Sequence, residues 1–317
     1  MIKFNYFVLI FAFLFANPIT AQNFDISKTD ITFNSGRYTL HGQLITPNNA
    51  KRNPVLIFLV KAGEEASYKT DYKDFLFEYL ENVFLNEGIA LLFFEKRGIG
   101  NSEGKWQRTN LYERAVDTKA AIDFLKTHPK IDSTKIGVIG HREGGWVAQI
   151  VGDYYSDDVK LVASIGTSTY DINLTLTNKY YSTNLCQYMS DKIAFDRATK
   201  KAVSDINWVS WFPLKKQWRE LREMRNFNPI PHILNLEVPS LFIFGQNDAL
   251  VYPEWALGVM SETFNNDLPS YFKFSTLPGV NQDLKQVEMC ATDEEINNAS
   301  YSQELKPILK TWILDNI

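Results

Sequence analysis

The sequence predicts an α/β protein built on a mainly parallel, doubly wound sheet with an inserted helical segment. Continuous apolar runs at residues 55–60 and 89–94 are typical of strands that are covered on both faces of a parallel sheet. Residues 74–86, between them, carry apolar side chains at helical spacing, and Gly88 follows directly. Strands and helices that alternate in this way favour right-handed crossovers around one sheet.

The other predicted elements continue this alternation. Two strands joined by a turn are expected at residues 31–33 and 38–45, further strands at 135–139, 161–165, 240–244 and 271–274, and helices at 111–127 and 307–317. From residue 171 to about residue 236 no strand pattern occurs, and helical segments rich in aromatic residues dominate.

This strand-free stretch is predicted to be a helical cap inserted between two strands. Its tryptophans include Trp208, Trp211 and Trp218. They either line a pocket that faces the sheet edge or form the cap's own core. The second alternative is favoured because buried aromatic side chains usually pack against one another.

Composition and the N-terminal segment indicate which partners and which compartment to expect. The chain has 317 residues, 45% of them hydrophobic, and a net charge of −4, which gives no basic patch for nucleic acid or for an anionic membrane surface. Residues 1–21 have the layout of a cleaved secretory signal peptide: a short basic start, an apolar run and a small-residue end. An uncleaved anchor is the alternative, but the apolar run is shorter than the roughly 20 residues that span a bilayer. We therefore expect a secreted or periplasmic domain over residues 22–317 with no later membrane span.

The cysteines and histidines give no metal or cofactor signal. Cys186 and Cys290 are the only cysteines. They can pair in an oxidising compartment, but their spacing does not establish contact, and two buried thiols are an equally open alternative. No paired metal-ligand spacing and no complete nucleotide-binding motif occurs, so neither a metal nor a cofactor is expected.

The most specific feature is the segment Gly140-His-Arg-Glu-Gly-Gly145, which lies between a predicted strand and a helix that begins near Trp146. A strand, a tight glycine turn and a helix are the setting of the G-x-S-x-G nucleophile elbow, where a serine attacks the substrate. Arg142 stands in the place of that serine. A guanidinium stays protonated and has no lone pair suited to acyl transfer, so this position holds no nucleophile.

Several motifs, in their order, resemble the α/β-hydrolase superfamily, and within it the secreted bacterial hydrolases related to acyl-aminoacyl and dipeptidyl peptidases and their esterase relatives. Besides the elbow, these are residues 95–102 (EKRGIGNS), the strand that ends on Asp248, and residues 277–281 (LPGVN). The resemblance covers nearly all of the chain after residue 31. It implies a nucleophile, an acid and a histidine in that order along the chain.

Placed on that scheme, the chain keeps only the acid. Asp248 stands at the acid position, but Gln282 stands where the histidine is expected, and a glutamine amide does not accept a proton near neutral pH. The four histidines, His41, His128, His141 and His232, all precede Asp248. We therefore predict no catalytic residue, and a binding site that comprises Arg142, Glu143, Asp248 and Gln282.

The loop that would supply an oxyanion-binding N–H also departs from the pattern. It reads Lys61-Ala-Gly-Glu-Glu65, so the two carboxylates of Glu64 and Glu65 are expected to crowd it. Negative charge beside a developing oxyanion is unfavourable. The backbone N–H of Glu143 remains as the other expected donor.

Two hypotheses describe what Arg142 does instead. It forms an ion pair with Asp248, and with Glu64 or Glu65, that plugs the former active site; or it contacts a carboxylate or phosphate of a ligand held under the cap. The predicted function is that of a non-catalytic pseudo-hydrolase that binds a small amphipathic or anionic ligand, or a protein partner of unknown identity. The alternative is an active carboxylic-ester or peptide hydrolase with an unorthodox site.

Overall fold

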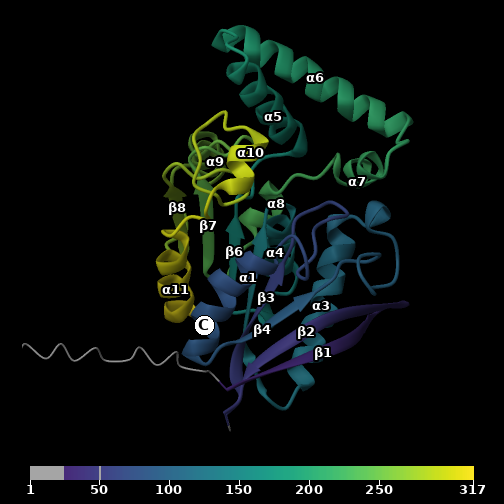
Figure 1. Ribbon diagram of the computed structural model, residues 1–317, viewed down its shortest axis with the longest axis vertical. Coiled ribbons are helices and arrows are strands. Elements are labelled where there is room, and N and C mark those ends of the chain that lie inside the picture. The colour runs from purple at the N-terminus through teal and green to yellow at the C-terminus, as the bar shows by residue number, and fades with distance from the viewer. Residues whose placement is uncertain (1–24, 50) are drawn as a thin grey trace, which may run out of the picture.

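The computed structural model describes residues 25–49 and 51–317, and it contains one eight-stranded sheet with helices on both faces (Figure 1). The strand order is β1-β2-β4-β3-β5-β6-β7-β8, in which β1 and β2 form an antiparallel hairpin, β2 is antiparallel to β4, and the remaining pairs are parallel. The strands are β1 (Ile26–Ser35), β2 (Tyr38–Pro47), β3 (Asn53–Leu59), β4 (Ala90–Phe94), β5 (Ile131–His141), β6 (Leu161–Ile165), β7 (Ser240–Gly245) and β8 (Phe272–Leu277). Every strand predicted from the sequence is present, and the predicted signal peptide, residues 1–21, lies outside the described residues.

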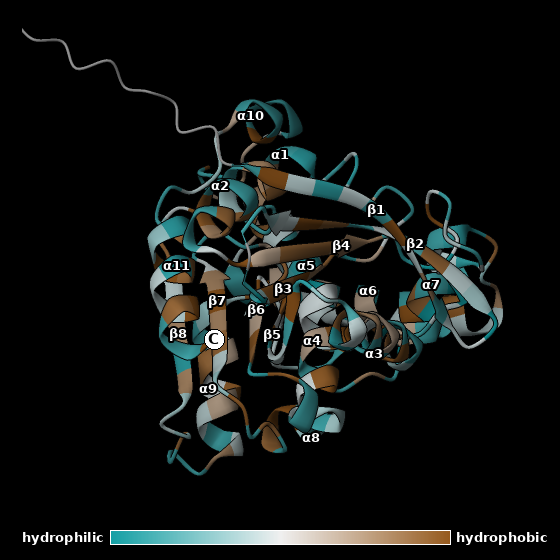
Figure 2. Ribbon diagram, turned by 90° about the horizontal axis from the view of Figure 1, so that it is seen from below, coloured by the Kyte–Doolittle hydropathy of each residue, from teal (hydrophilic) through white to brown (hydrophobic). Residues whose placement is uncertain are grey.

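The sheet separates two apolar layers, and β3 shows why its sequence is apolar throughout. Val55, Ile57 and Leu59 belong to one buried cluster, whereas Leu56 and Phe58 belong to the other. Helices α3 (Leu111–Thr127) and α4 (Glu143–Tyr154) cover the first face, while α1 (Lys73–Leu76) and α11 (Leu305–Asn316) cover the second. Figure 2 shows β3 and its neighbour β4 as largely hydrophobic ribbons, and the surrounding helices as mixed in character.

The predicted helix at residues 74–86 is present as several short helical pieces. They are α1, a π-helical turn (Phe77–Glu81), α2 (Asn82–Phe84) and a 3-10 turn (Leu85–Glu87). Within the π turn, Tyr79 is fully buried, stacks on Phe75 at a ring-centroid distance of 5.0 Å, and donates a hydrogen bond to the carbonyl of Ser302 at 2.8 Å. Gly88 ends the segment with φ of 78°. Two helices were not predicted, α9 (Pro253–Thr263) and α10 (Asp293–Asn298).

The cap consists of the four helices between β6 and β7, in the stretch where the sequence shows no strand pattern. They are α5 (Ile172–Cys186), α6 (Asp191–Trp211), α7 (Lys216–Met224) and α8 (Ile230–Leu234). In Figure 1, α5 and α6 extend beyond the end of the sheet and α6 forms the outer edge of the molecule. No helix within the described residues is long and apolar enough to cross a membrane.

Both expectations for Trp208 and Trp211 were wrong. Trp208 is 52% exposed and Trp211 is 80% exposed, so neither forms a cap core or lines a pocket over the sheet. The buried side chains of α6 are small ones, Ala194, Ala198, Ala202 and Val209, and this narrow face leaves the tryptophans on the outside. Trp218, on α7, is partly buried.

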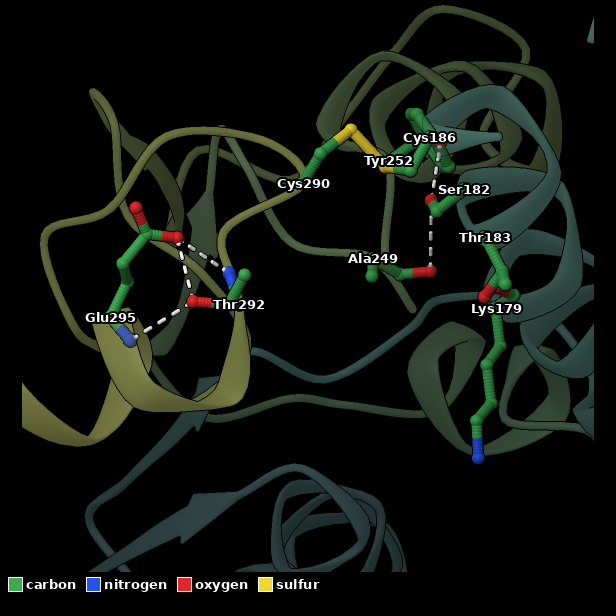
Figure 3. Close-up of a disulfide and its surroundings, with 9 residues drawn as sticks. All are labelled: Lys179, Ser182, Thr183, Cys186, Ala249, Tyr252, Cys290, Thr292 and Glu295. Atoms are coloured by element: carbon green, nitrogen blue, oxygen red, sulfur yellow. Dashed lines mark hydrogen bonds between the residues drawn. A yellow bond between two sulfur atoms is a disulfide. The ribbon is translucent and has the colours of Figure 1, made fainter. Parts of the chain in front are cut away.

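The two cysteines form a disulfide, which decides the alternative that the sequence left open. Cys186 ends α5 and Cys290 lies in the segment between β8 and α10, with their Cα atoms 5.5 Å apart (Figure 3). Close to the bridge, the hydroxyl of Ser182 approaches the carbonyl of Ala249 and the hydroxyl of Tyr252. The disulfide therefore ties the cap to the part of the chain that carries Gln282.

Candidate binding site at the strand–helix elbow

Arg142 joins β5 to α4 in a backbone conformation that residues other than glycine rarely adopt, with φ of 53° and ψ of −120°. Such a conformation costs of order 1–3 kcal/mol and persists only where the surroundings fix it. The Arg142 N–H donates to the Ile165 carbonyl at 2.8 Å, and the Arg142 carbonyl accepts from the Thr167 hydroxyl at 2.9 Å. The strained elbow of a nucleophile motif is thus built, with an arginine at its apex.

The three glycines of the motif are required by close packing. A Cβ atom on Gly140 would lie 2.1 Å from the Gly144 carbonyl oxygen. A Cβ atom on Gly144 would lie 2.2 Å from the Leu59 carbonyl oxygen, and one on Gly145 would lie 1.9 Å from the Thr167 hydroxyl. No side chain fits at these distances, so the motif's spacing is dictated by how closely α4 approaches the strands.

The Arg142 guanidinium has one carboxylate within 4.0 Å and no hydrogen-bond acceptor among the described residues. Its Nη1 lies 4.0 Å from Oδ1 of Asp283, its Nε is buried without a partner, and the side chain is 23% exposed. The expected ion pair with Asp248, Glu64 or Glu65 is not formed in the described structure. The nearest carboxylate is Asp283, directly after Gln282, a residue that the sequence analysis did not consider.

Glu64 and Glu65 do not reach the site because both side chains point to solvent. Glu64 is exposed and lies 2.6 Å from Lys216 on α7, and Glu65 is exposed as well. The expectation that these two carboxylates crowd the loop was therefore wrong. Other carboxylates, those of Glu143 and Glu220, contact the loop instead.

Each backbone N–H from residue 61 to residue 63 already has an acceptor. The N–H of Lys61 donates to the Tyr72 hydroxyl at 3.2 Å. The N–H of Ala62 donates to the Glu143 carboxylate at 3.0 Å, and the N–H of Gly63 donates to both oxygens of Glu220, at 2.9 and 3.2 Å. None of these three N–H groups is thus free to bind an oxyanion in this structure.

Burial alone would raise the pKa of Glu143, but the Arg142 charge and the N–H of Ala62 hold it at about 2. The charge of Glu143 in turn opposes the effect of burial on Arg142, whose pKa is raised. Both side chains are therefore ionised at neutral pH. Among the neighbouring negative charges, Glu143 raises the pKa of Arg142 most, and Asp283 raises it next most.

Asp248 lies three residues after the end of β7; it is buried, and only one of its two carboxylate oxygens has a hydrogen-bond partner. Its Oδ1 accepts the backbone N–H groups of Leu250 and Val251 at 2.7 and 3.0 Å, whereas Oδ2 is buried without a partner. Burial raises the pKa of Asp248 to about 7, against the effect of those two N–H groups and of Arg142. The carboxyl group of Asp248 therefore changes between its protonated and its ionised form near neutral pH.

Gln282 and His141 contact each other through the backbone of Gln282. Nε2 of His141 donates to the Gln282 carbonyl at 2.9 Å, so Nδ1 accepts from the Tyr72 hydroxyl at 2.6 Å. Burial, reinforced by the charges of Arg142 and Lys61, lowers the pKa of His141 to about 3. His141 is thus a neutral, fully engaged side chain. The Gln282 amide donates to Asp283 at 3.3 Å and makes no hydrogen bond to Asp248.

A second group of charges beneath the cap was missed by the sequence analysis. Lys96 donates to the carbonyls of Lys61 and Gly63 at 3.0 and 2.6 Å, and Arg114 donates to the Val60 carbonyl. Burial, with the charge of Arg114, lowers the pKa of Lys96 to about 7. Lys96 belongs to the EKRG segment that the sequence singled out, but no pattern indicates that Glu220 of the cap reaches the same loop.

One cavity reaches His141 of the elbow and a second lies beside Gln282; Arg142 is a lining residue of neither. The first, of about 280 Å³, is lined by residues that include Lys61, His141 and Asp283. The second, of about 310 Å³, is lined by Gln282 together with Asn281, Ala249 and the apolar side chains of Val287 and Met289, next to the disulfide. The described part of the chain holds no cluster of three His, Cys, Asp or Glu side chains that could bind a metal ion.

Residues 16–210 match the family described as Esterase FrsA-like. The chain belongs to this family. The matched range includes the elbow and Arg142, and it ends before Asp248 and Gln282. The resemblance to α/β-hydrolases that the sequence motifs indicate is thereby confirmed.

Solved structures show the same fold at low identity. An esterase of Butyrivibrio proteoclasticus, Est1E, solved with ferulic acid bound, superposes with a TM-score of 0.57 and 15% identity over 90% of this chain and 98% of its own. The Pyrococcus furiosus esterase Pf2001 gives 0.57 and 18%, over 92% and 91%. An acylaminoacyl peptidase of Pyrococcus horikoshii gives 0.52 and 17%, over 81% of this chain and 37% of its own. The predicted fold class, an α/β-hydrolase sheet with flanking helices, is confirmed.

Proposed function

We propose that this protein is a non-catalytic member of the esterase family, in which Arg142 binds the carboxylate or phosphate group of a small ligand. One observation carries the proposal: a guanidinium without a hydrogen-bond acceptor among the described residues occupies the apex of the elbow, where the family fold presents a nucleophile. Five fixed N–H donors suit a planar carboxylate or a phosphate. The side chain is 23% exposed, so a ligand can reach it.

The surroundings favour an anionic group with an apolar portion. The N-terminus of α4 begins at Glu143 and adds a partial positive charge beside Arg142. The cavity next to Gln282 offers apolar side chains, Val287 and Met289, within reach of polar ones. Gln282 lines this cavity and directly precedes Asp283, whose carboxylate lies 4.0 Å from Arg142, so we propose an amphipathic carboxylate with its head group at Arg142 and its apolar part in this cavity.

The compartment is part of the proposal. We infer that the mature protein is secreted or periplasmic, as its N-terminal segment predicts. The disulfide between Cys186 and Cys290 supports an oxidising environment, because such bonds persist mainly outside the cytosol.

An active ester or peptide hydrolase is the second candidate, and the comparisons favour it. The family and the structural neighbours named above are esterases and peptidases. In such an enzyme Asp248, whose pKa is about 7 and whose Oδ2 is unoccupied, would take a proton from water. Arg142 would then stabilise the oxyanion. The elbow favours the binding role instead, because it holds no nucleophile and the N–H groups of residues 61–63 are occupied.

Two assays on the purified protein distinguish these candidates. We expect no turnover of p-nitrophenyl acetate or butyrate and no labelling by a fluorophosphonate probe. We expect saturable binding of octanoate or phenyl phosphate in calorimetry, weakened at least about tenfold in Arg142→Gln, which corresponds to roughly 1.4 kcal/mol. The matched control is Arg52→Gln, an exposed arginine directly before β3 and so at the opposite end of that strand from the loop at residues 61–63; it should bind as the native protein does.

Saturable turnover by the native protein that is lost in Asp248→Ala would replace the binding proposal with the hydrolase. Equal affinity of native protein and Arg142→Gln for both probes would remove Arg142 from the site. A double variant, Arg142→Ser with Gln282→His, restores the two expected triad side chains. We expect it to remain inactive because Glu143 and Glu220 still occupy the loop N–H groups.

A further inference from the structure

The cap ends in a cluster of exposed aromatic and aliphatic side chains that no part of the described chain covers. We call Trp208, Trp211, Phe212 and Leu214 the cap tip; they lie at the end of α6 and in the turn to α7. Their exposed fractions are 52%, 80%, 53% and 73%. Trp208 and Phe212 contact each other at a ring-centroid distance of 5.1 Å. Large apolar side chains gathered at such exposure indicate an interaction surface.

Basic side chains surround the cap tip. Lys200 lines the same surface groove as Trp208, Trp211 and Phe212. Lys215 and Lys216 follow Leu214 directly in the sequence, and Lys215 lies 5.4 Å from the ring centre of Trp218. Of these three lysines, only Lys216 has an ion-pair partner among the described residues, namely Glu64.

Several acidic side chains of the neighbouring elements are paired or buried, whereas Asp196 of α6 and Glu65 are exposed and have no ion-pair partner among the described residues. Asp205, on the same helix, forms an ion pair with Lys201, and Glu220 of α7 is buried against Gly63. Residues 199–219 carry four lysines and one arginine against a single acid, Asp205, so the cap tip lies in a positive segment although the whole chain carries a net charge of −4. Net charge alone gives no indication of this local excess.

The backbone of the turn satisfies its own polar groups. The N–H of Phe212 donates to the Trp208 carbonyl, and the N–H of Leu214 donates to the Phe212 carbonyl, both at 2.8 Å. The Arg219 guanidinium donates to the Pro213 and Leu214 carbonyls at 3.1 and 3.4 Å. A turn whose N–H and C=O groups are bonded internally loses little when it leaves water, which is the condition for entering a lipid interface.

We propose that the cap tip docks on an anionic lipid bilayer, with Trp211 and Leu214 in the headgroup–acyl boundary and Lys200 and Lys215 against the lipid phosphates. Tryptophan is suited to this boundary because its ring is apolar and its N–H stays hydrated. Lysines beside an inserted apolar group add attraction to anionic lipid. The unpaired lysines beside the apolar side chains, and the internally bonded backbone of the turn, favour an anionic lipid surface over a folded protein. This inference is independent of the ligand proposed for Arg142.

Vesicle binding tests the proposal on the full protein. We expect sedimentation with vesicles of phosphatidylcholine containing phosphatidylglycerol, and little with phosphatidylcholine alone. The double variant Trp211→Ser, Leu214→Ser should lose at least about tenfold in partition coefficient, and Lys200→Gln, Lys215→Gln should lose the dependence on anionic lipid. The matched control is Tyr188→Ser, which removes a 99% exposed aromatic side chain just beyond the opposite end of α6 and should bind as the native protein does.

Three outcomes would overturn the proposal. The first is no binding to anionic vesicles, and the second is an equal loss in the Tyr188 and the Trp211, Leu214 variants. The third is concentration-dependent dimerisation in sedimentation velocity that the Trp211, Leu214 variant abolishes, which would assign the cap tip to a second copy of this chain. Far-ultraviolet circular dichroism confirms that each variant is folded.

Discussion

Glu220 of cap helix α7 accepts the backbone N–H of Gly63 through both carboxylate oxygens, at 2.9 and 3.2 Å. This contact joins two segments separated by 157 residues. It fastens the cap to the loop after β3, next to the buried charges of Lys96 and Arg114. The cap is therefore held to the sheet domain by a charged contact at the site as well as by the disulfide.

Glu220→Gln should destabilise the protein by about 1–3 kcal/mol, because Lys96 and Arg114 lose their nearby negative charge. Urea unfolding measures the change. Glu223→Gln, on the same helix, removes a carboxylate that is 27% exposed and paired with its neighbour Arg222. That control should change the free energy of unfolding by less than about 0.5 kcal/mol. Equal effects of the two substitutions would mean that the contact with Gly63 does not fasten the cap.

The buried carboxyl of Asp248 should make stability fall as pH rises. Its pKa in the folded protein is about 7, whereas an unfolded aspartate titrates near 3.8. Between these values the folded protein holds the extra proton, so its stability is highest below the unfolded pKa and decreases until the pH passes the folded one. Asp248→Asn cannot ionise. The free energy of unfolding of Asp248→Asn, compared with that of the native protein, should therefore rise by about 2–4 kcal/mol between pH 4 and pH 8.

Chemical unfolding of both proteins at several pH values measures this difference. Asp30→Asn removes a carboxylate from the exposed face of β1 and controls for the change in net charge. Parallel stability–pH curves for the native protein and Asp248→Asn would contradict the raised pKa.

The elbow glycines offer a matched pair of substitutions. Gly144→Ala places a methyl group 2.2 Å from the Leu59 carbonyl oxygen, and it should destabilise the protein by at least about 3 kcal/mol or prevent folding. Gly258→Ala, within α9, meets no atom within 4 Å and should stabilise the protein by about 0.5–1 kcal/mol through its helix propensity. Thermal unfolding of the two variants compares them. A Gly144→Ala protein as stable as the native one would show that α4 can move away from β3.

Removal of the disulfide should loosen the cap. The bond spans 104 residues, and replacing Cys186 and Cys290 together by serine should lower the free energy of unfolding by about 2–5 kcal/mol. Limited proteolysis should then cut first within the cap. Dithiothreitol should bring the native protein to the stability of the double variant and leave the variant unchanged. Native stability in the double variant would show that the bond adds nothing to the contacts that already hold the cap.

Much of the fold follows from local sequence patterns. The apolar run of β3 is continuous because alternate side chains enter two opposite layers, and that requirement is visible in the sequence. The elbow is visible as well, because a glycine is needed wherever α4 and the strands leave no room for a Cβ atom. Exposed tryptophans were misread because aromatic residues in a helix are usually buried, and only the small-residue face of α6 reveals which side packs.

The sequence alone placed an arginine at the apex of a nucleophile elbow and left only an aspartate of the expected triad, because strand, turn and helix signals are local. It did not decide which carboxylates face that arginine. Arg142 lies near Asp283 rather than Asp248, and the loop N–H groups bind Glu143 and Glu220 rather than pointing to an open cavity. These pairings depend on the directions of side chains from segments far apart in the chain, and only the packing of the cap and loops against the sheet fixes those directions.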